Sequence, residues 1–289
     1  MKLKQLAGDA ALLLATRLVA RFFGESVDTP PFDEHLAAIR MQLPKVDATG
    51  LHDVSVTSLA GTHSSSFHVL HWRGAEAPVL IWHQGGGERP FDLTIGRMYP
   101  AKVHCDFNVI AIQTPLQNSL REANTYFAHL HNYVAMMATV VRMAELFLTE
   151  TPLAASRCKM MGGYSLGGIV SNRHRVEYGS ADLYFPFMAG TCHGDIFAKS
   201  VRMGPAGRKN LAAVRDRLNF DRQWAEAAPA NVFPVLGKTD MLNRLGIQGP
   251  SYEPTPYEVW DGGHLYGAAR PHLLRKKIEA HFLASIAAR

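Results

Sequence analysis

The stretch CKMMGGYSLGGIV, residues 158–170, places Ser165 between two pairs of glycines, after a short apolar run and before a helix-like segment. Glycine weakens strands and helices alike, so glycines gathered at one point must answer a geometric need. We expect the backbone to turn there too sharply for side chains and to present Ser165. Residues 163–167 match G-x-S-x-G, a weak signal alone but typical of a nucleophile elbow between a strand and a helix. The alternative is a glycine-rich turn with a serine N-cap.

Strand-like and helix-like segments alternate on both sides of this turn. Residues 53–59 and 66–72 alternate in polarity, as half-buried antiparallel edge strands do, whereas 77–83 and 107–113 are continuously apolar, as buried strands are. A helical pattern covers 124–150. The remaining predicted elements are strands at 157–163 and 181–190, strand-then-loop units at 231–240 and 256–264, and helices at 166–178 and 269–287. This order predicts an α/β fold with a mostly parallel central sheet and helices on both faces. Residues 191–230 predict two or three helices without a strand, which we interpret as a small cap over the strand ends.

The ends and the composition of the chain limit the remaining choices. We expect an N-terminal helical extension over 1–45, joined at Pro30-Pro31 to a main domain over 46–289. Residues 1–23 predict an amphipathic helix packed on the body, with a membrane-surface anchor or a signal segment as alternatives. The net charge of +5 is scattered over 289 residues, which disfavours a nucleic-acid partner. Three cysteines without metal-type spacing favour reduced thiols and a cytoplasmic location.

A serine hydroxyl needs a base and an acid before it can act as a nucleophile. His264 is the candidate base, because it follows a strand-like segment in the glycine-rich loop DGGHLYG, whereas His272 and His281 fall in the closing helix. Asp240 is the candidate acid, at the end of the strand-then-loop unit NVFPVLGKTD. Its alternative role is an N-cap, and the rival acids are Asp261, Glu253 and Asp195.

The oxyanion of an acyl transfer also needs donors. The loop WHQGGGERP, residues 82–90, follows a buried strand, and consecutive glycines let backbone N–H groups approach a substrate closely. The candidate donors are the N–H of Leu166 and one N–H from Gln84, Gly85 or Gly86. The alternatives are an ordinary loop or a phosphate-binding loop, although no G-x-x-x-x-G-K-[ST] motif is present.

The order HQGGG, GYSLG, GKTD and GGH over residues 50–289 resembles the α/β-hydrolase superfamily. The resemblance implies an α/β-hydrolase fold with Ser165 as nucleophile, Asp240 as acid, His264 as base and residues 83–87 at the oxyanion hole. The sequence departs from the family in one place, because members often have glycine directly after the histidine and here Gln84 intervenes. This leaves open which amide is the second donor, and whether the Gln84 side chain faces the substrate.

These residues predict hydrolysis of an ester-like small molecule through an acyl-enzyme, with no organic cofactor and no metal. A carboxylesterase is the first choice. Peptidase, thioesterase and lactonase activities use the same machinery, and a membrane-associated lipid hydrolase is a further option. A non-catalytic binding protein on the same fold is the alternative from another class. The sequence leaves the natural substrate and the oligomeric state open.

Overall fold

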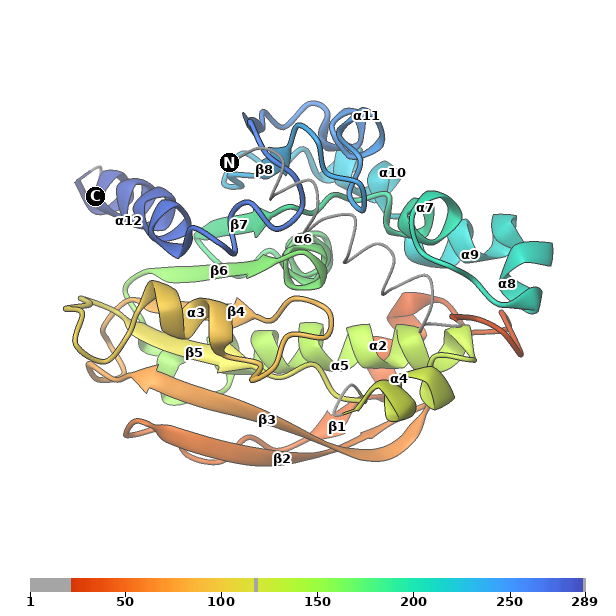
Figure 1. The fold of residues 1–289 in the computed structure, drawn as a ribbon. Helices are drawn as coiled ribbons and strands as arrows, with labels where there is room; N and C mark the ends of the chain where they lie inside the picture. Colours follow the sequence, from red (N-terminus) through yellow and green to blue (C-terminus); the bar gives the residue numbers. More distant parts are fainter. Residues whose placement is uncertain (1–21, 117–118, 288–289) are drawn as a thin grey trace.

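A mixed sheet of nine strands runs through the structure, a computed structural model that describes residues 22–116 and 119–287 (Figure 1). The strands are β1 (Arg40–Met41), β2 (Gly50–Ser58), β3 (Gly61–His71), β4 (Val79–His83), β5 (Asn108–Ile112), β6 (Lys159–Tyr164), β7 (Leu183–Phe187), β8 (Val235–Gly237) and β9 (Glu258–Trp260). They lie side by side in the order β1-β2-β3-β5-β4-β6-β7-β8-β9. Strands β4 to β9 run parallel, and β1, β2 and β3 add an antiparallel edge.

The polarity of each strand matches its place in the sheet. Strand β2 alternates between exposed and buried residues over its C-terminal half, as predicted for a half-buried edge. Every residue of β4, β5 and β7 is buried, as expected for parallel strands covered on both faces. The predicted mostly parallel sheet is therefore confirmed.

Helices cover both faces of this sheet. They are α2 (Phe32–Ala38), α3 (Leu93–Met98), α4 (Leu120–Tyr126), α5 (Leu130–Thr149), α6 (Leu166–Glu177), α7 (His193–Lys199), α8 (Pro205–Lys209), α9 (Leu211–Leu218), α10 (Asp221–Ala227), α11 (Leu245–Gln248) and α12 (Pro271–Ala287), with short 3₁₀ turns at Pro152–Ala155 and Pro250–Tyr252. Helices α5 and α6 share one buried apolar cluster with one face of the sheet, and α3 and α12 share a second cluster with the other. The two clusters cover the two faces of the sheet, so a site is expected at the carboxyl ends of its parallel strands.

The structure differs from the sequence-based expectation in three places. The helical pattern 124–150 is broken at His129, whose backbone is extended, because the N–H of Leu130 donates to the carbonyl of Ser26 instead of continuing a helix. Residues 191–230 contain four short helices, α7 to α10, where two or three were expected. The short helices α2 and α3 were not predicted.

The expected helix over 1–23 lies outside the described residues, except for Phe22 and Phe23. Those two rings pack against Tyr133 of α5 and Phe197 of α7. The expected domain boundary at residue 45 and the cap role of 191–230 stay predictions, and β1 on the N-terminal side of that boundary pairs with β2. Within 22–116 and 119–287, no helix is both long enough and apolar enough to cross a bilayer.

Candidate active site

Ser165 sits in the turn between β6 and α6 with an unusual backbone. Its φ of 55° and ψ of −115° place a non-glycine residue in a sparsely populated region, at a cost of about 1–3 kcal/mol. The N–H of Ser165 donates to the carbonyl of Phe187 at 2.8 Å, which ties the turn to the neighbouring strand β7. The strand, sharp turn and helix predicted around this serine are therefore present.

The glycines around Ser165 let backbones cross without side chains. A Cβ on Gly163 would lie 2.3 Å from the carbonyl carbon of Gly167, so β6 and the first turn of α6 meet directly. A Cβ on Gly167 would lie 2.2 Å from the carbonyl oxygen of His83, so the same turn also contacts the end of β4. No side chain fits at either position, which explains the composition of the motif.

The structure brings Ser165, His264 and Asp240 together from three loops. His264 Nε2 lies 2.9 Å from Ser165 Oγ, and His264 Nδ1 lies 2.7 Å from Asp240 Oδ2. His264 and Asp240 are buried, with 3% and 5% exposure, while Ser165 is partly exposed. The buried end of this chain of hydrogen bonds is thus the acid, and its accessible end is the hydroxyl.

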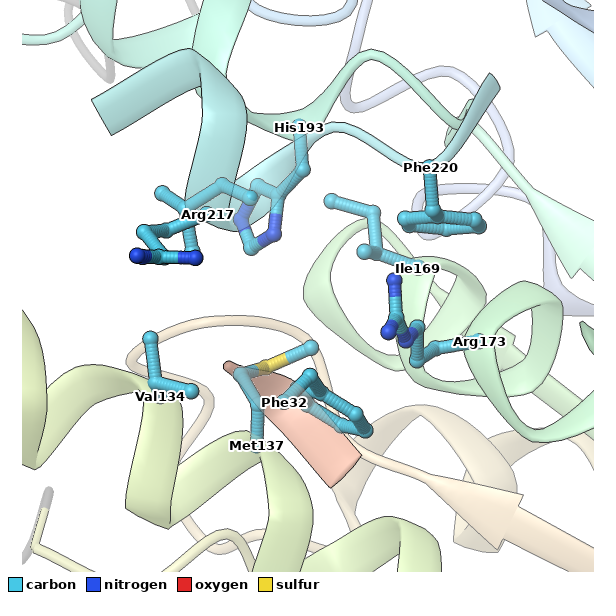
Figure 2. A pocket seen from close by; sticks show the side chains of 9 residues that line it. Phe32, Val134, Met137, Ile169, Arg173, His193, Arg217 and Phe220 are labelled. Atoms are coloured by element: carbon cyan, nitrogen blue, oxygen red, sulfur yellow. The ribbon is translucent and has the colours of Figure 1, made fainter. Parts of the chain in front are cut away.

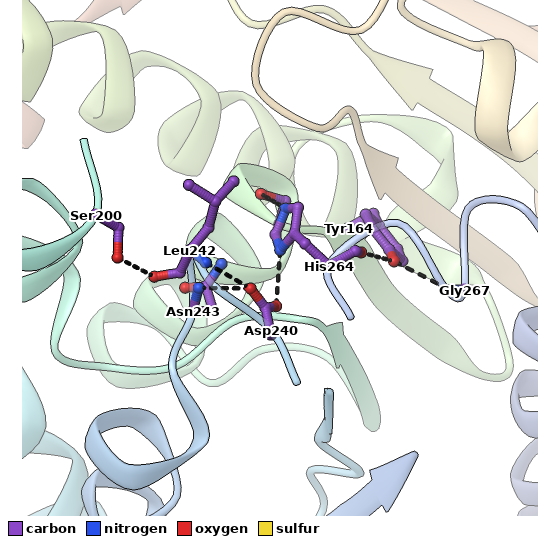
Figure 3. Close-up of polar contacts among 8 residues, drawn as sticks. Tyr164, Ser200, Asp240, Leu242, Asn243, His264 and Gly267 are labelled. Atoms are coloured by element: carbon purple, nitrogen blue, oxygen red, sulfur yellow. Dashed lines mark hydrogen bonds and ion pairs between the residues drawn. The ribbon is translucent and has the colours of Figure 1, made fainter. Parts of the chain in front are cut away.

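Hydrogen-bond donors surround the carboxylate of Asp240, and this carboxylate determines which nitrogen of the His264 imidazole carries the proton. Asp240 Oδ1 accepts from the N–H groups of Leu242 at 2.8 Å and Asn243 at 2.9 Å, as Figure 3 shows. The hydroxyl of Ser200 donates to the carbonyl of Leu242 at 3.0 Å and steadies that turn. A carboxylate is an acceptor only, so Nδ1 of His264 carries the proton that faces it. Nε2, 2.9 Å from Ser165 Oγ, is then the acceptor that faces the serine hydroxyl.

The rival residues lie elsewhere. Asp195 accepts two hydrogen bonds from Arg215, at 2.7 and 3.0 Å, and one from Asn219. Asp261 is exposed and lies 3.9 Å from Lys238 Nζ. Glu253 is exposed, and of the two histidines in α12, His281 stacks on Phe233 with ring centroids 3.7 Å apart. The carboxylate of Asp240, by contrast, contacts the histidine ring beside Ser165.

The glycine loop after β4 faces the first turn of α6. A Cβ on Gly86 would lie 3.7 Å from Leu166 Cβ, so the loop and the residue after Ser165 are neighbours. The N–H of Gly85 already donates to Glu88 Oε2 at 2.9 Å. Among the described residues, the N–H groups of Leu166 and Gly86 make no backbone hydrogen bond outside the helices and strands, whereas Gln84 directly follows the residue of β4 that pairs with Ile112 of β5. Which of the three loop amides is the second donor stays a prediction, and Gly86 is the one that lies beside Leu166.

The sequence did not predict the orientation of two side chains in this loop, Gln84 and Glu88. Gln84 is 3% exposed, and its Oε1 accepts from the N–H of Thr114 at 3.0 Å, so the idea that this side chain faces a substrate is wrong. Glu88 bridges the loop to α3, because its other oxygen accepts from the N–H of Thr94 at 2.5 Å. Burial raises the pKa of Glu88, although both N–H donors oppose that shift. No sequence signal marks Glu88, since its partners depend on how the loop folds back.

The charge of His83 and the capacity of the site to hold a metal ion also bear on its chemistry. Burial lowers the pKa of His83, at the end of β4, to about 3, so its ring is neutral and adds no cation to the glycine loop. Within the described part of the chain, no group of three or more His, Cys, Asp or Glu side chains is arranged to hold a metal ion.

A small cavity is lined in part by Ile169 of α6 (Figure 2). Its volume of about 10 Å³ is room for about one water molecule. The guanidinium of Arg173 borders it, 4.1 Å from the ring centre of Phe32, 5.2 Å from that of Phe220, and paired with Glu177 at 2.6 Å. This cavity is too small for an ester substrate.

Comparison with known proteins gives structural relatives only. No protein-family model and no curated protein matches the sequence. An acetyl xylan esterase from a Paenibacillus species is 12% identical, over 89% of this chain and 97% of its own, with a TM-score of 0.55. An esterase from Pyrococcus furiosus is 12% identical, over 81% of this chain and 95% of its own, with a TM-score of 0.53. A peroxisomal α/β-hydrolase from Saccharomyces cerevisiae is 13% identical, over 87% of this chain and 89% of its own, also with a TM-score of 0.53. At these identities the likeness concerns the fold.

Proposed function

We propose that this chain, which has the α/β-hydrolase fold, is a serine hydrolase that cleaves carboxylic esters through an acyl-enzyme. One observation carries the proposal. The hydrogen bonds from Ser165 to His264 and from His264 to Asp240 form an unbroken chain that starts at an accessible, strained serine. A serine that was only a helix N-cap would need neither partner, and this serine makes no side-chain cap bond among the described residues.

The acylation step follows from the positions of the protons. Ser165 Oγ bonds to the ester carbonyl carbon while its proton passes to His264 Nε2. The imidazolium that forms is stabilised by Asp240, which holds the Nδ1 proton at 2.7 Å. As the tetrahedral intermediate collapses, the bond to the leaving alkoxide breaks and Nε2 returns the proton to it. Water then attacks the acyl-enzyme by the same route and releases the acid and Ser165.

Two backbone amides complete this mechanism. The N–H of Leu166 lies at the N-terminus of α6, where the helix dipole favours negative charge. The second hydrogen bond would come from an N–H of the glycine loop, where Gly86 lies beside Leu166. These donors should bind the oxyanion more strongly than the planar carbonyl, and one such donor is worth about 10²–10³-fold in rate.

Esters are the substrate class we favour over amides and thioesters. Two of the structural relatives quoted above are esterases by name, which makes an ester panel the first assay to run. The same side chains would serve a peptidase, a thioesterase, a lactonase or a lipid hydrolase. The ester panel would also show which acyl length and which leaving group the protein prefers.

Labelling with a fluorophosphonate tests the proposal, because this probe reacts only with an activated serine. Wild type, Ser165→Ala and the control Ser156→Ala would be treated in parallel, and the labelled peptide located by mass spectrometry. The control serine lies at the other end of β6, where its hydroxyl bonds the carbonyls of Ala77 and Cys158. We expect labelling at Ser165 in the wild type and the control and none in Ser165→Ala. A folded wild type that is not labelled and cleaves no p-nitrophenyl ester would favour a non-catalytic binding protein.

A further inference from the structure

Tyr164, the residue before Ser165, reaches from the nucleophile turn to the loop that carries the base. Its side chain is 3% exposed and belongs to the apolar cluster on the α12 side of the sheet. Its hydroxyl donates to the carbonyl oxygen of His264 and accepts from the N–H of Gly267 at 3.2 Å (Figure 3). One hydroxyl thus holds the base loop at two points, three residues apart.

The loop also packs directly on the tyrosine ring. The rings of Tyr164 and His264 meet edge to face with centroids 6.0 Å apart. A Cβ on Gly267 would lie 2.9 Å from Tyr164 Cε2, so only a glycine lets the loop approach this closely. These contacts therefore restrain the backbone at His264 and after it, and not the His264 ring alone.

The base loop needs such a restraint. His264 follows Gly262 and Gly263, which have many backbone conformations to lose when the loop is ordered. The imidazole is held at Nδ1 by Asp240, but a ring fixed at one nitrogen can still pivot. Fixing the carbonyl of His264 itself sets where the side chain begins, and so sets the 2.9 Å contact with Ser165.

We propose that Tyr164 is a positioning residue that couples the nucleophile to the general base. It touches no reacting atom. Its backbone leads directly into Ser165 and its hydroxyl holds His264, so a single side chain sets the distance between them. The inference rests on the proposed function, because it concerns the geometry of that reaction.

Tyr164→Phe tests this proposal, since it removes one oxygen atom and leaves the ring packing. Tyr184→Phe is the matched control: Tyr184 is equally buried in β7, and its hydroxyl bonds the N–H of Ala181 and the ring of His174. For each protein we would measure kcat and KM on a p-nitrophenyl ester, the rate of fluorophosphonate labelling, thermal unfolding, and hydrogen exchange of residues 261–267.

We expect Tyr164→Phe to lower kcat and the labelling rate together by about 10- to 100-fold, because a misplacement near 1 Å costs up to that much. KM should change by less than about twofold, and residues 261–267 should exchange faster. Tyr184→Phe should lose comparable stability and keep its kcat. Should Tyr164→Phe fail to fold, Gly267→Ala pushes the loop from the ring and should give the same loss of kcat.

Two results would overturn the inference. One is a Tyr164→Phe enzyme with wild-type kcat and labelling rate, which would leave the proposed function intact. The other is an equal loss of kcat in Tyr184→Phe, which would mean that any lost buried hydroxyl has this effect. A wild type that is not labelled at Ser165 would overturn the proposed function and this inference together.

Discussion

Gly167 lies where the first turn of α6 crosses the end of β4, and replacing it with alanine should separate the two halves of the site. The added Cβ would lie 2.2 Å from the carbonyl oxygen of His83 and 2.7 Å from its carbonyl carbon, whereas ordinary contact begins at 3.4 Å. Both atoms belong to backbone, so no side chain can rotate away. Either α6 or the end of β4 must move by about 1 Å.

That movement acts on the chemistry directly, because Ser165 starts α6 and the glycine loop continues from His83. A misplacement of about 1 Å can cost about 10²-fold in rate, so we expect Gly167→Ala to lower kcat by about two orders of magnitude. Overpacking should also lower the free energy of unfolding by about 1–3 kcal/mol. Kinetics on a p-nitrophenyl ester, the fluorophosphonate labelling rate and thermal unfolding by circular dichroism measure both effects.

Gly246→Ala in α11 is the matched control. A Cβ at Gly246 meets no atom within 4 Å, and glycine inside a helix is less stable than alanine by about 0.5–1 kcal/mol. The control should therefore keep its kcat and gain slightly in stability. A Gly167→Ala protein with the kcat and unfolding temperature of the wild type would refute the argument that the turn requires bare backbone at this crossing.

Three further predictions concern charged groups. Asp240→Asn should lower kcat by about 10⁴-fold with little change in KM, because the amide no longer holds the tautomer of His264 that accepts the serine proton; a loss below tenfold would argue against Asp240 as the acid. Glu88→Gln should lower kcat by about tenfold, since an amide cannot accept both loop hydrogen bonds. Burial raises the pKa of Glu88 above its unfolded value, so its contribution to stability is full below the unfolded pKa and is lost as pH rises through the folded pKa. The stability of Glu88→Gln relative to wild type should therefore improve from pH 4 to pH 7, and urea titrations at both values would measure it. Arg173→Met should destabilise the fold by about 1–3 kcal/mol by leaving the half-buried carboxylate of Glu177 unpaired, and adding Glu177→Met should recover part of that loss in thermal unfolding.

The sequence allowed the sheet and the meeting of Ser165, His264 and Asp240 to be predicted, because both depend on local patterns. Apolar runs mark buried strands, and in a parallel sheet the loops after those strands gather at one edge. The three residues follow β6, β8 and β9 of the parallel part of the sheet, so their proximity could be expected, while their catalytic roles stay a prediction.

Features that depend on distant partners could not be predicted. The helical pattern 124–150 is periodic throughout, yet it breaks at His129 because the backbone at Ser26 pairs there. The direction of the Gln84 side chain is set by Thr114, thirty residues away. Local sequence contains no information about either partner, so periodicity favoured a continuous helix and left the orientation of Gln84 open.

Three segments form the site: the glycine loop after β4, the turn at Ser165 and the loop that carries His264. Contacts of the backbone mainly hold them together, and Tyr164 takes part in the contacts of each segment. Its carbonyl oxygen lies against Gly85 of the glycine loop, where a Cβ would be 3.5 Å away. Its own chain continues into Ser165, and its hydroxyl holds the carbonyl of His264. Catalytic groups must stay within about 0.5 Å of their working geometry, and long side chains alone rarely achieve this. A change at any one of the three segments should therefore alter the reactivity of Ser165, even when no hydrogen bond of Ser165, His264 and Asp240 is removed.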